Sequence, residues 1–269
     1  MPPSALLSYY ELARSELKRF SAYPLAIFAG IFTNAVFGFI RGSVLVGALA
    51  GAGGTIAGYD PALALSYVWI GQAVIAPIGL FVRRDVADRV RTGEIAVDLA
   101  RPVDFQLSWW ARDMGRFAFG VPTRGLPTLL IGIVVVGIAW PKDWTAYPLG
   151  LFSLLLGTSL NFLCMYAINL IAFWVVDAGG YLNLYGLALN LLSGFLIPVH
   201  IFPAWLLDVA LRTPFPSIFQ TPVDILSGRT VGWDAVGLIG IQAGWLIAVI
   251  VLGRVLLAAG SRRLVVQGG

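Results

Sequence analysis

The chain has 269 residues, of which 58% are hydrophobic and 12% charged, and its formal net charge is +4. Soluble domains are about 45 to 50% apolar and about 25% charged, so this composition excludes an ordinary soluble protein and indicates an all-α polytopic membrane protein. A helix of about 20 apolar residues crosses the hydrocarbon core of a bilayer, so each uncharged run of that length is a candidate span. Six such runs occur, and we expect them to form a single transmembrane domain over residues 1–269.

The segment before the first apolar run has the pattern of an amphipathic helix. Apolar residues recur there every three or four positions, at Leu6, Tyr10, Ala13, Leu17 and Phe20. Charged residues occupy the rest of the helical wheel, so we expect a helix that lies in the inner headgroup layer, with a solvated helix as the alternative. Both charge signs occur in this segment, which argues against a cleavable signal peptide.

Three candidate spans lie in the first half of the chain, at residues 21–40, 61–82 and 117–140. The third is interrupted by two prolines and by Arg124, which is the only charged residue inside a predicted span. A charge inside a span is a candidate for function, although at this depth its side chain could also extend to the headgroups or pair with a neighbour. The start of the third span therefore stays open.

The second half of the chain holds three further candidate spans, at residues 148–176, 180–198 and 235–253. The fourth lies in an uncharged run that is too long for a straight crossing, so its helix must tilt, bend or protrude. The fifth loses helical continuity at Pro198 and Pro203. Pairs of glycines with the four-residue spacing of close helix contacts are Gly38 with Gly42 and Gly240 with Gly244.

The distribution of basic residues predicts the orientation in the membrane. An even number of spans places both termini on the same side, and 13 of the 18 Lys and Arg residues then lie on that side. Positive residues mark the cytoplasmic side, so we expect both termini in the cytoplasm. Four basic residues are assigned to the outer side, namely Arg41, Lys142, Arg212 and Arg229. Topology thus accounts for the positive net charge without a nucleic-acid partner.

The sequence lacks the chemistry of an ATP-hydrolysing enzyme. Such an enzyme needs the loop G-x-x-x-x-G-K-[ST], whose backbone amides and lysine hold the phosphates. The only lysines are Lys18 and Lys142, and neither lies in such a loop. Single copies of histidine (His200) and cysteine (Cys164) argue against a metal cluster and an intrachain disulfide. We therefore expect no catalytic, metal or cofactor site here, and ATP with Mg²⁺ on a separate subunit.

Charge is concentrated between the second and third spans, where residues 83–116 hold 13 of the 32 charged residues. Oppositely charged residues lie four apart between positions 84 and 89, which supports a helix. This pattern predicts that the second helix extends beyond the membrane as far as Gly93, a residue that favours a helix end.

A second short helix is expected directly after Gly93, from Glu94 to Arg101. Ile95 and Leu99 lie on one face of this helix and charged residues on the other. A short rigid helix of this kind is suited to docking in a groove of a soluble partner. The alternative is a cytoplasmic hairpin that packs on the chain itself.

At this point the sequence resembles a known family. The stretch GEIAVDLARPVDFQLSWWARDMGR at residues 93–116 is similar to the segment G-x-I-x-x-x-L-x-R-P of permease subunits in the ABC-2 exporter group. The matching residues are Gly93, Ile95, Leu99, Arg101 and Pro102. LLSGFLIPVHIFP at 191–203 resembles the end of that family's fifth helix, and PFPSIFQTPVDILSG at 214–228 the outer segment that follows it. The likeness covers nearly the whole chain, and points to the subfamily with two permeases beside one ATPase.

The resemblance implies a half-transporter in the inner (cytoplasmic) membrane of the cell, surrounded by membrane lipid. Two six-span permeases, identical or homologous with a heteromeric pair favoured, would face each other above two copies of an ABC ATPase subunit. The cytoplasmic segment would be the coupling helix that receives the ATP-driven motion. Its contact residues would be Arg91, Glu94, Ile95, Asp98, Leu99 and Arg101.

The resemblance also implies a transport path. Related permeases line this path with the second and fifth helices, which here offer Tyr67, Trp69, Asn183 and Asn190. A re-entrant helix over Ile201 to Leu211 would cap the exit, with an outer gate formed by Pro198, Phe202 and Pro203. An aromatic, uncharged path fits export of an amphipathic small molecule, such as a drug, or of a lipid-like molecule.

An ATP-independent carrier or channel is the alternative function. Such proteins often contain internal repeats and buried carboxylates that couple transport to an ion. No repeat is evident in the sequence, and no acidic residue lies well inside a predicted span. We therefore favour the permease subunit of an ATP-driven exporter.

Overall fold

The computed structural model describes residues 3–21, 23–175 and 177–263. Within these ranges every regular element is a helix, and the single extended pairing is an isolated bridge between Ile56 and Tyr59. The predicted all-α architecture is thus confirmed. Five helical rods are long and apolar enough to cross a membrane, namely Pro24–Gly51 (α2), Pro61–Ile78 (α3), Phe105–Val136 (α6 to η2), Ala146–Phe173 (α8 with η3) and Gly232–Ser261 (α13).

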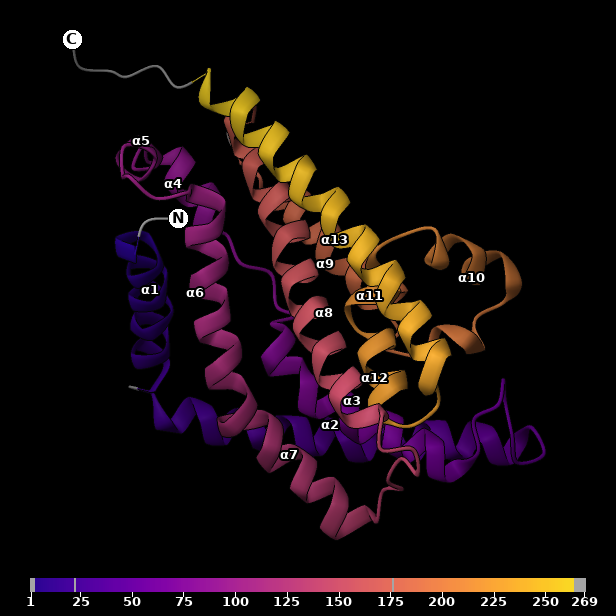
Figure 1. Cartoon of the computed structure of the whole chain (residues 1–269). Coiled ribbons are helices and arrows are strands. Elements are labelled where there is room, and N and C mark those ends of the chain that lie inside the picture. Colours follow the sequence, from indigo (N-terminus) through magenta and orange to yellow (C-terminus); the bar gives the residue numbers. More distant parts are fainter. Residues whose placement is uncertain (1–2, 22, 176, 264–269) are drawn as a thin grey trace.

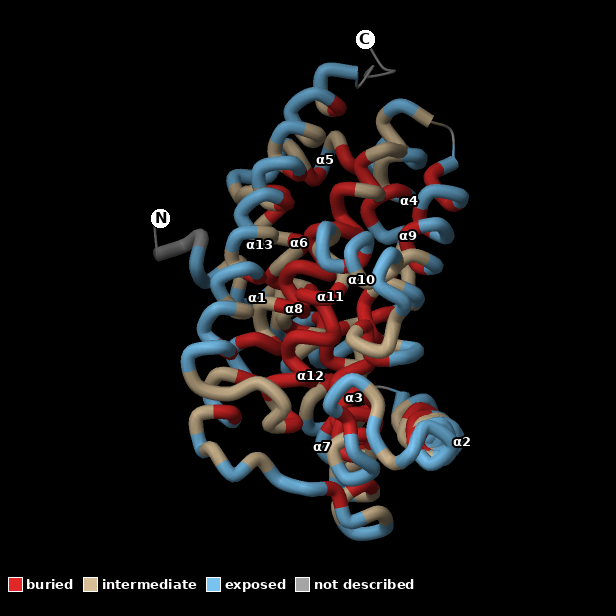
Figure 2. The backbone as a smooth tube through the Cα atoms, turned by 90° about the vertical axis from the view of Figure 1, so that its right-hand side faces the viewer, coloured by how far each residue is buried: buried red, intermediate tan, exposed pale blue. Residues whose placement is uncertain are grey.

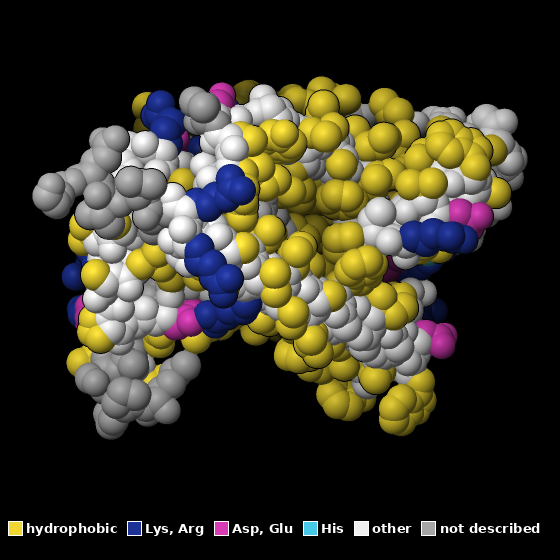
Figure 3. All heavy atoms as spheres, turned by 90° about the horizontal axis from the view of Figure 1, so that it is seen from above, with side chains coloured by type: hydrophobic (Ala, Val, Ile, Leu, Met, Phe, Trp, Pro, Cys, Tyr) yellow, Lys and Arg dark blue, Asp and Glu magenta, His cyan; other side chains and the backbone are white. Residues whose placement is uncertain are grey.

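The rods divide into two central ones and three peripheral ones (Figure 1). In α3 and in α8 with η3, 72% of the most apolar 18-residue stretch of the helix is buried in the molecule, against 22% of that stretch in α2 and 17% in α13. The buried residues gather along the middle of the molecule (Figure 2), and apolar side chains cover much of the face seen from above (Figure 3). Outward-facing apolar helices of this kind suit a hydrocarbon surround.

The segments predicted to share the inner side of the membrane gather at one end of the molecule. The start of α1 (Pro3–Ser21), the short helices α4 (Asp85–Arg91) and α5 (Ile95–Leu99) and the end of α13 lie at the upper left of Figure 1. The link from α2 to α3 and helix α10 (Ala204–Leu211) lie on the opposite side. This grouping matches the predicted arrangement, whose cytoplasmic orientation stays a prediction.

Helix α1 packs along α6 (Phe105–Gly120) (Figure 1). Glu16 is buried in this contact, and a Cβ atom at Gly115 of α6 would lie 2.1 Å from the carbonyl oxygen of Ala13. The predicted apolar stripe is divided, because Leu6, Tyr10 and Leu17 are exposed, whereas Ala13 and Phe20 are half-buried in the contact with α6. Placement of the exposed part in the headgroup layer stays a prediction.

Helix α2 is longer than predicted, because it continues from residue 40 to Gly51. Arg41, which had been assigned to the outer side beyond the first span, lies inside this helix, and its side of the membrane stays a prediction. The glycine pair of α2 packs closely on α3, since a Cβ at Gly38 would lie 3.1 Å from the Trp69 ring. The second predicted pair has no such contact, because Gly240 and Gly244 face open space.

The second predicted span ends earlier than expected. α3 stops at Ile78, and Gly79 adopts a φ of +69°, a left-handed conformation that favours glycine and ends helices. The chain is not helical again until α4 begins at Asp85. The predicted continuous helix through residues 82–92 was therefore wrong, and α4 and α5 together form a separate elbow.

Two asparagines of α8 explain this break. Asn161 donates hydrogen bonds to the carbonyls of Ile78 and Gly79 at 3.1 and 3.0 Å. Asn169 accepts one from the amide of Ala87 at 2.9 Å and donates another to the preceding loop. Side chains of α8 thus satisfy backbone groups that would otherwise be buried without partners where the chain leaves the helix.

The third rod begins at Phe105, twelve residues before the predicted span 117–140, whose start had been left open. Asp104 caps it by accepting a hydrogen bond from the amide of Leu107 at 2.8 Å. The predicted interruption by prolines is absorbed by a π-helical turn, a local widening that tolerates a missing backbone bond. The parts after α6 are η1 (Val121–Gly125), α7 (Leu126–Ile131) and η2 (Gly132–Val136).

Arg124 lies in the first π turn and packs on α2. A Cβ at Gly30 would lie 2.0 Å from its guanidinium, and its Nε is buried without a hydrogen-bond partner. Among the described residues no carboxylate pairs with it. Of the alternatives that the sequence left open, structural pairing is thus not observed here.

The fifth helix, α9 (Gly179–Leu192), has 14 residues and a length of about 21 Å, which is short for a hydrocarbon core of about 30 Å. The chain then turns through Gly194 and the 3-10 turn η4 (Val199–Ile201) into α10. Helices α11 (Phe215–Ile218) and α12 (Gln220–Leu226) follow and are buried against α8, whereas α10 is largely exposed. The segment that folds back into the bundle is thus α11 and α12, beyond the predicted re-entrant range of 201–211.

Candidate functional site

The elbow formed by α4 and α5 turns its apolar side toward the chain itself. Ile95 is fully buried and Leu99 is half-buried against the core. Asp98 is also buried, with Arg89 at 3.0 Å and Arg101 at 3.7 Å from its carboxylate oxygens. The predicted apolar docking face therefore packs internally, as in the alternative of a self-packed hairpin.

A different set of side chains on the elbow is open to a partner. Val97 is 63% exposed, and Arg91, Glu94 and Arg101 are exposed around it. Glu94 contributes one internal ion pair, with Arg89 at 3.3 Å. The exposed surface of the elbow is thus a small apolar centre within a charged rim, which is the usual composition of a protein contact.

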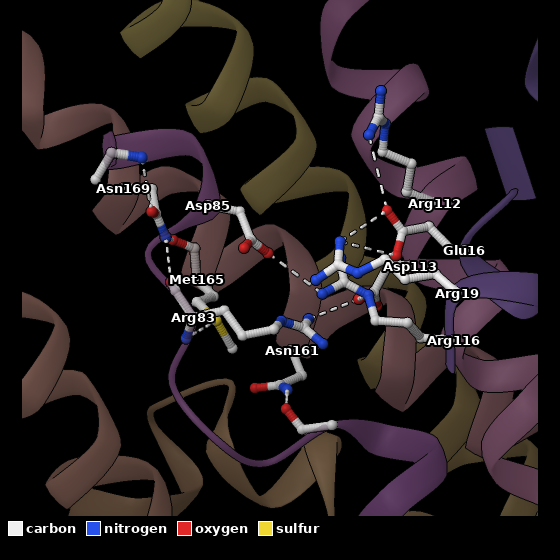
Figure 4. Close-up of polar contacts among 12 residues, drawn as sticks. Glu16, Arg19, Arg83, Asp85, Arg112, Asp113, Arg116, Asn161, Met165 and Asn169 are labelled. Atoms are coloured by element: carbon white, nitrogen blue, oxygen red, sulfur yellow. Dashed lines mark hydrogen bonds and ion pairs between the residues drawn. The ribbon is translucent and has the colours of Figure 1, made fainter. Parts of the chain in front are cut away.

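Buried ion pairs fix the elbow to the helices beneath it (Figure 4). Arg83, in the link that leads into α4, contacts Asp113 of α6 at 2.6 Å, and Asp113 is 2% exposed. Burial lowers the pKa of Arg83, an effect that the adjacent Asp113 opposes. Arg116 of α6 contacts Asp113 at 3.4 Å and Asp85 of α4 at 3.3 Å. Displacement of α4 would therefore strain the Arg116 contact with Asp85 and pull on the adjoining link that the buried Arg83–Asp113 pair holds, so α4 and α6 should move together.

Helices α1 and α13 are tied to the same end. Glu16 of α1 pairs with Arg112 of α6 at 3.7 Å, and Tyr9 accepts a hydrogen bond from the amide of Asp104 at 3.0 Å. The Asp104 carboxylate in turn pairs with Arg254 of α13. The elbow thus belongs to a connected polar layer that spans α1, α4, α6 and α13.

A second polar cluster is centred on Asp224 of α12, on the other side of the molecule. This carboxylate is 1% exposed. Tyr59 donates to it at 3.2 Å, Gln220 donates at 2.8 Å, and His200 lies 3.1 Å from its second oxygen. Arg229 approaches to 3.9 Å and lies over the Tyr59 ring. Burial raises the pKa of Tyr59, so its hydroxyl remains a donor at neutral pH.

The same cluster holds the chain that follows α9. The Tyr67 hydroxyl lies 2.7 Å from both the Gly194 carbonyl and the Gln220 Oε1 atom, one of which takes its proton. Gln220 Oε1 also accepts a hydrogen bond from the amide of Val199 at 3.0 Å. Residues 193–199 are therefore locked to α3 and α12 by the side chains of Tyr67 and Gln220. We call these contacts, together with those of Asp224, the outer latch.

The structure separates the predicted path and gate residues. Tyr67 and Trp69 are buried inside the chain, whereas Asn183 is exposed and Asn190 half-buried on the outward face of α9. Of the predicted gate, Pro198 is buried beside the latch, Phe202 is half-buried and Pro203 is exposed at the start of α10. A common path for the four predicted residues would need a different arrangement of α3 and α9.

Sequence reasoning missed Asp224 and Gln220, the two side chains that organise the outer latch. Both lie in PFPSIFQTPVDILSG, a stretch that had been matched to an outer segment as a whole. The available signal was an acidic residue and a glutamine four apart in an otherwise apolar stretch, a spacing that places them on one helix face.

Comparisons with known proteins agree with this architecture. Residues 44–268 match the family described as ABC-2 family transporter protein. No curated protein matches the chain. The family match covers most of the chain and coincides with the bundle of apolar rods, so the protein belongs to the ABC-2 transporter family and is a multi-pass membrane permease.

Proposed function

We propose that this protein is the transmembrane permease subunit of an ATP-driven exporter in the cell inner membrane. Family membership implies a partner ABC ATPase. In the proposed assembly two ATPase subunits bind ATP and Mg²⁺, and a second permease, homologous rather than identical, completes the path. The cargo is an amphipathic or lipid-like molecule that leaves the cytoplasm.

The observation that carries this proposal is the anchored elbow. Val97, Arg91, Glu94 and Arg101 form an exposed surface, while Ile95 and Asp98 beneath them are buried. A partner that pushes on this surface acts on the pair of Asp85 in α4 with Arg116 in α6, and through α6 on the pairs with α1 and α13. Motion imposed at the elbow thus has a physical route into the transmembrane helices.

The elbow can be tested by placing negative charges on its exposed surface. We expect the double variant Arg91→Glu with Val97→Glu to lose at least about tenfold of its affinity for the ATPase, because two new carboxylates in a contact that suits a cation and an apolar side chain cost more than about 1.4 kcal/mol. Nucleotide-driven transport should fall with it. Co-purification with the ATPase and transport in proteoliposomes measure the two effects.

The matched control is Arg14→Glu with Arg262→Glu, two exposed arginines at the same end of the molecule but off the elbow. This control should bind the ATPase and transport like the wild type. Asp98 is unsuited to reversal, because it is buried between Arg89 and Arg101 and its loss would damage the fold. Undiminished ATPase binding by the elbow variant would remove α4 and α5 from the contact.

An ATP-independent carrier is the second candidate, and one observation favours it. Asp224 is a buried carboxylate next to the only histidine, and buried acids couple ions in many carriers. Its contacts with Arg229, Tyr59 and Gln220 support a structural role instead. Transport by the purified permease in proteoliposomes that contain no ATPase would favour the carrier.

A further inference from the structure

A cavity of about 240 Å³ opens between the later half of α2, the start of α3 and the chain that follows α9. Its lining is almost wholly apolar and includes Ile40, Val44, Ala48, Val68, Leu196 and Ile201. Val44 is 68% exposed and Leu196 52%, so the mouth of the cavity is apolar as well. A water molecule takes about 30 Å³, so the volume is large enough for an apolar chain, and apolar cavities accept apolar ligands.

One charged side chain lines this cavity, namely Arg41. Its Nη2 donates to the Leu196 carbonyl at 3.2 Å, and its guanidinium lies over the Phe195 ring at 4.8 Å. Its Nε and Nη1 atoms are buried and have no hydrogen-bond partner. Within the described parts of the chain no carboxylate forms an ion pair with it.

A cation in this setting is costly without a counter-ion. A buried charge usually pairs or finds a full set of hydrogen bonds, and charged residues inside membrane helices mark ligand sites. Arg41 lies ten residues before the end of α2, about 15 Å along the helix axis. A ligand group with a negative charge at this depth would supply the counter-charge that Arg41 lacks among the described residues.

We infer that this cavity binds an anionic amphiphile, whose phosphate or carboxylate head pairs with the Arg41 guanidinium and whose apolar tail lies along Val44, Ala48 and Ile201. The apolar mouth admits such a molecule sideways from a bilayer. A carboxylate side chain of another protein would neutralise Arg41 but would leave the apolar volume empty. For this reason we favour an amphiphile over a protein contact.

The cavity is joined directly to the outer latch. Tyr67 lines the cavity and its hydroxyl contacts Gly194 and Gln220, while Arg41 holds the carbonyl of Leu196 two residues further on. An anion drawn to Arg41 competes with the Leu196 carbonyl for the guanidinium. Occupancy therefore weakens one of the contacts that hold residues 193–199. If the occupant is the cargo of the exporter, that cargo belongs to the class of anionic amphiphiles. This last step rests on the proposed function.

Binding can be measured on the purified permease alone, in a neutral maltoside detergent, with radiolabelled dodecyl phosphate as the probe. We expect Arg41→Gln to weaken binding at least tenfold and Arg41→Lys to restore part of it. Val44→Trp, which fills the cavity and keeps Arg41, should also weaken binding. Arg212→Gln, an exposed arginine outside the cavity lining, is the matched control and should bind like the wild type.

Two results would overturn the site. The first is equal binding by the wild type, Arg41→Gln and Val44→Trp. The second is competition by inorganic phosphate at the same concentration as dodecyl phosphate, because the tail would then contribute nothing. If Arg41→Gln does not fold, the Val44→Trp variant and the phosphate competition still decide the question.

A second arm separates membrane lipid from cargo. Binding is repeated in nanodiscs of phosphatidylcholine, with and without phosphatidylglycerol. Persistence of dodecyl phosphate binding in the acidic lipid supports a cargo site, and its loss there would overturn the cargo assignment while the site itself stands. With the ATPase added, nucleotide-dependent release of bound dodecyl phosphate supports export, and retained binding without release would contradict the proposed function but not the site.

Discussion

Asp224 shows how one buried side chain can organise a segment that the sequence leaves undefined. Its two carboxylate oxygens form hydrogen bonds with Tyr59, Gln220 and His200, and the Arg229 guanidinium lies nearby. A carboxylate so placed is compensated only while all its partners are present, since removal of one member of a buried pair leaves the other uncompensated. The outer latch should therefore depend strongly on this residue.

We expect Asp224→Asn to destabilise the protein by roughly 3 kcal/mol, because Arg229 loses its buried counter-charge and the hydrogen bond of Tyr59 to the carboxylate is weakened. Thermal unfolding of the purified variant in detergent should show a lower midpoint. Asp208→Asn, on the exposed face of α10, is the matched control and should leave the midpoint unchanged. Equal unfolding midpoints for the two variants would mean that Asp224 does not contribute to the stability of the protein.

Gly194 supports the latch through its backbone. Its φ is +87°, and a Cβ there would lie 2.1 Å from Gln220 Oε1 and 2.8 Å from the Tyr67 hydroxyl. Gly194→Ala should therefore cost the strain of a left-handed alanine, about 1 kcal/mol, and disrupt the hydrogen bonds of the latch as well. Gly137→Ala is matched in strain, with φ of +73°, but meets open space.

Comparison of these two variants separates the destabilisation caused by the clash of the added Cβ from that caused by the backbone strain. We expect the unfolding midpoint to fall further for Gly194→Ala than for Gly137→Ala, and proteolysis between residues 193 and 203 to increase for the former alone. Similar behaviour of the two would show that Tyr67 and Gln220 tolerate the added methyl group by moving aside.

At the scale of elements, the helix ends depend on contacts that lie far away in the sequence. The amphipathic and apolar patterns predicted the helices, since these patterns are local. The end of α3 depends on Asn161 and Asn169, about 80 residues further on, whose side chains satisfy the backbone at the break. At the start of the third rod, the amide of the capping residue Asp104 likewise donates to a distant side chain, the Tyr9 hydroxyl of α1. Such tertiary partners cannot be assigned from hydropathy alone.

In the candidate site too, local sequence patterns predicted the elements but not the long-range contacts. The sequence located the elbow at the right residues, because its charges, glycine and proline are local signals. It could not tell which face of a five-residue helix is buried, and the predicted contact residue Ile95 lies inside. Asp224 and Arg41 escaped notice because each needed a partner from another helix to become recognisable. Local patterns thus place elements, and long-range contacts decide which side chains are free.

Docking of α1 on α6 gives a prediction at this scale. A methyl group at Gly115 would meet the backbone of Ala13 at 2.1 Å, which cannot be relieved by rotation of a side chain. We expect Gly115→Ala to release α1 and to raise hydrogen exchange over residues 6–20 and 83–91, because the buried Glu16 pair is lost. Gly240→Ala in α13, where the added methyl group meets open space, is the control and should leave hydrogen exchange over residues 6–20 and 83–91 unchanged. Unaltered exchange in Gly115→Ala would show that α1 and α6 separate without consequence.

At the scale of the whole molecule, the outward faces of the peripheral helices differ in chemistry. α13 exposes apolar side chains such as Ile247 and Val255, which suit lipid. α9 exposes Asn183 beside Leu184 and Leu187, and it is too short to cross the core by itself. A polar amide facing lipid lacks hydrogen-bond partners, whereas one facing protein or a wet path can find them.

The exposed face of α9 should therefore meet the second permease, and a photo-crosslinking residue placed at Leu187 tests this in membranes that contain the complete transporter. We expect an adduct with the mass of two permeases, since Leu187 is 69% exposed and lies between the two asparagines of that face. The same residue at Ile247 of α13, which is 63% exposed, should yield lipid adducts. Exposure is nearly equal at the two positions, so a difference in products reports the neighbour rather than accessibility. Permease adducts at Ile247 with lipid adducts at Leu187 would assign the contact to α13 and leave the asparagines of α9 facing the bilayer.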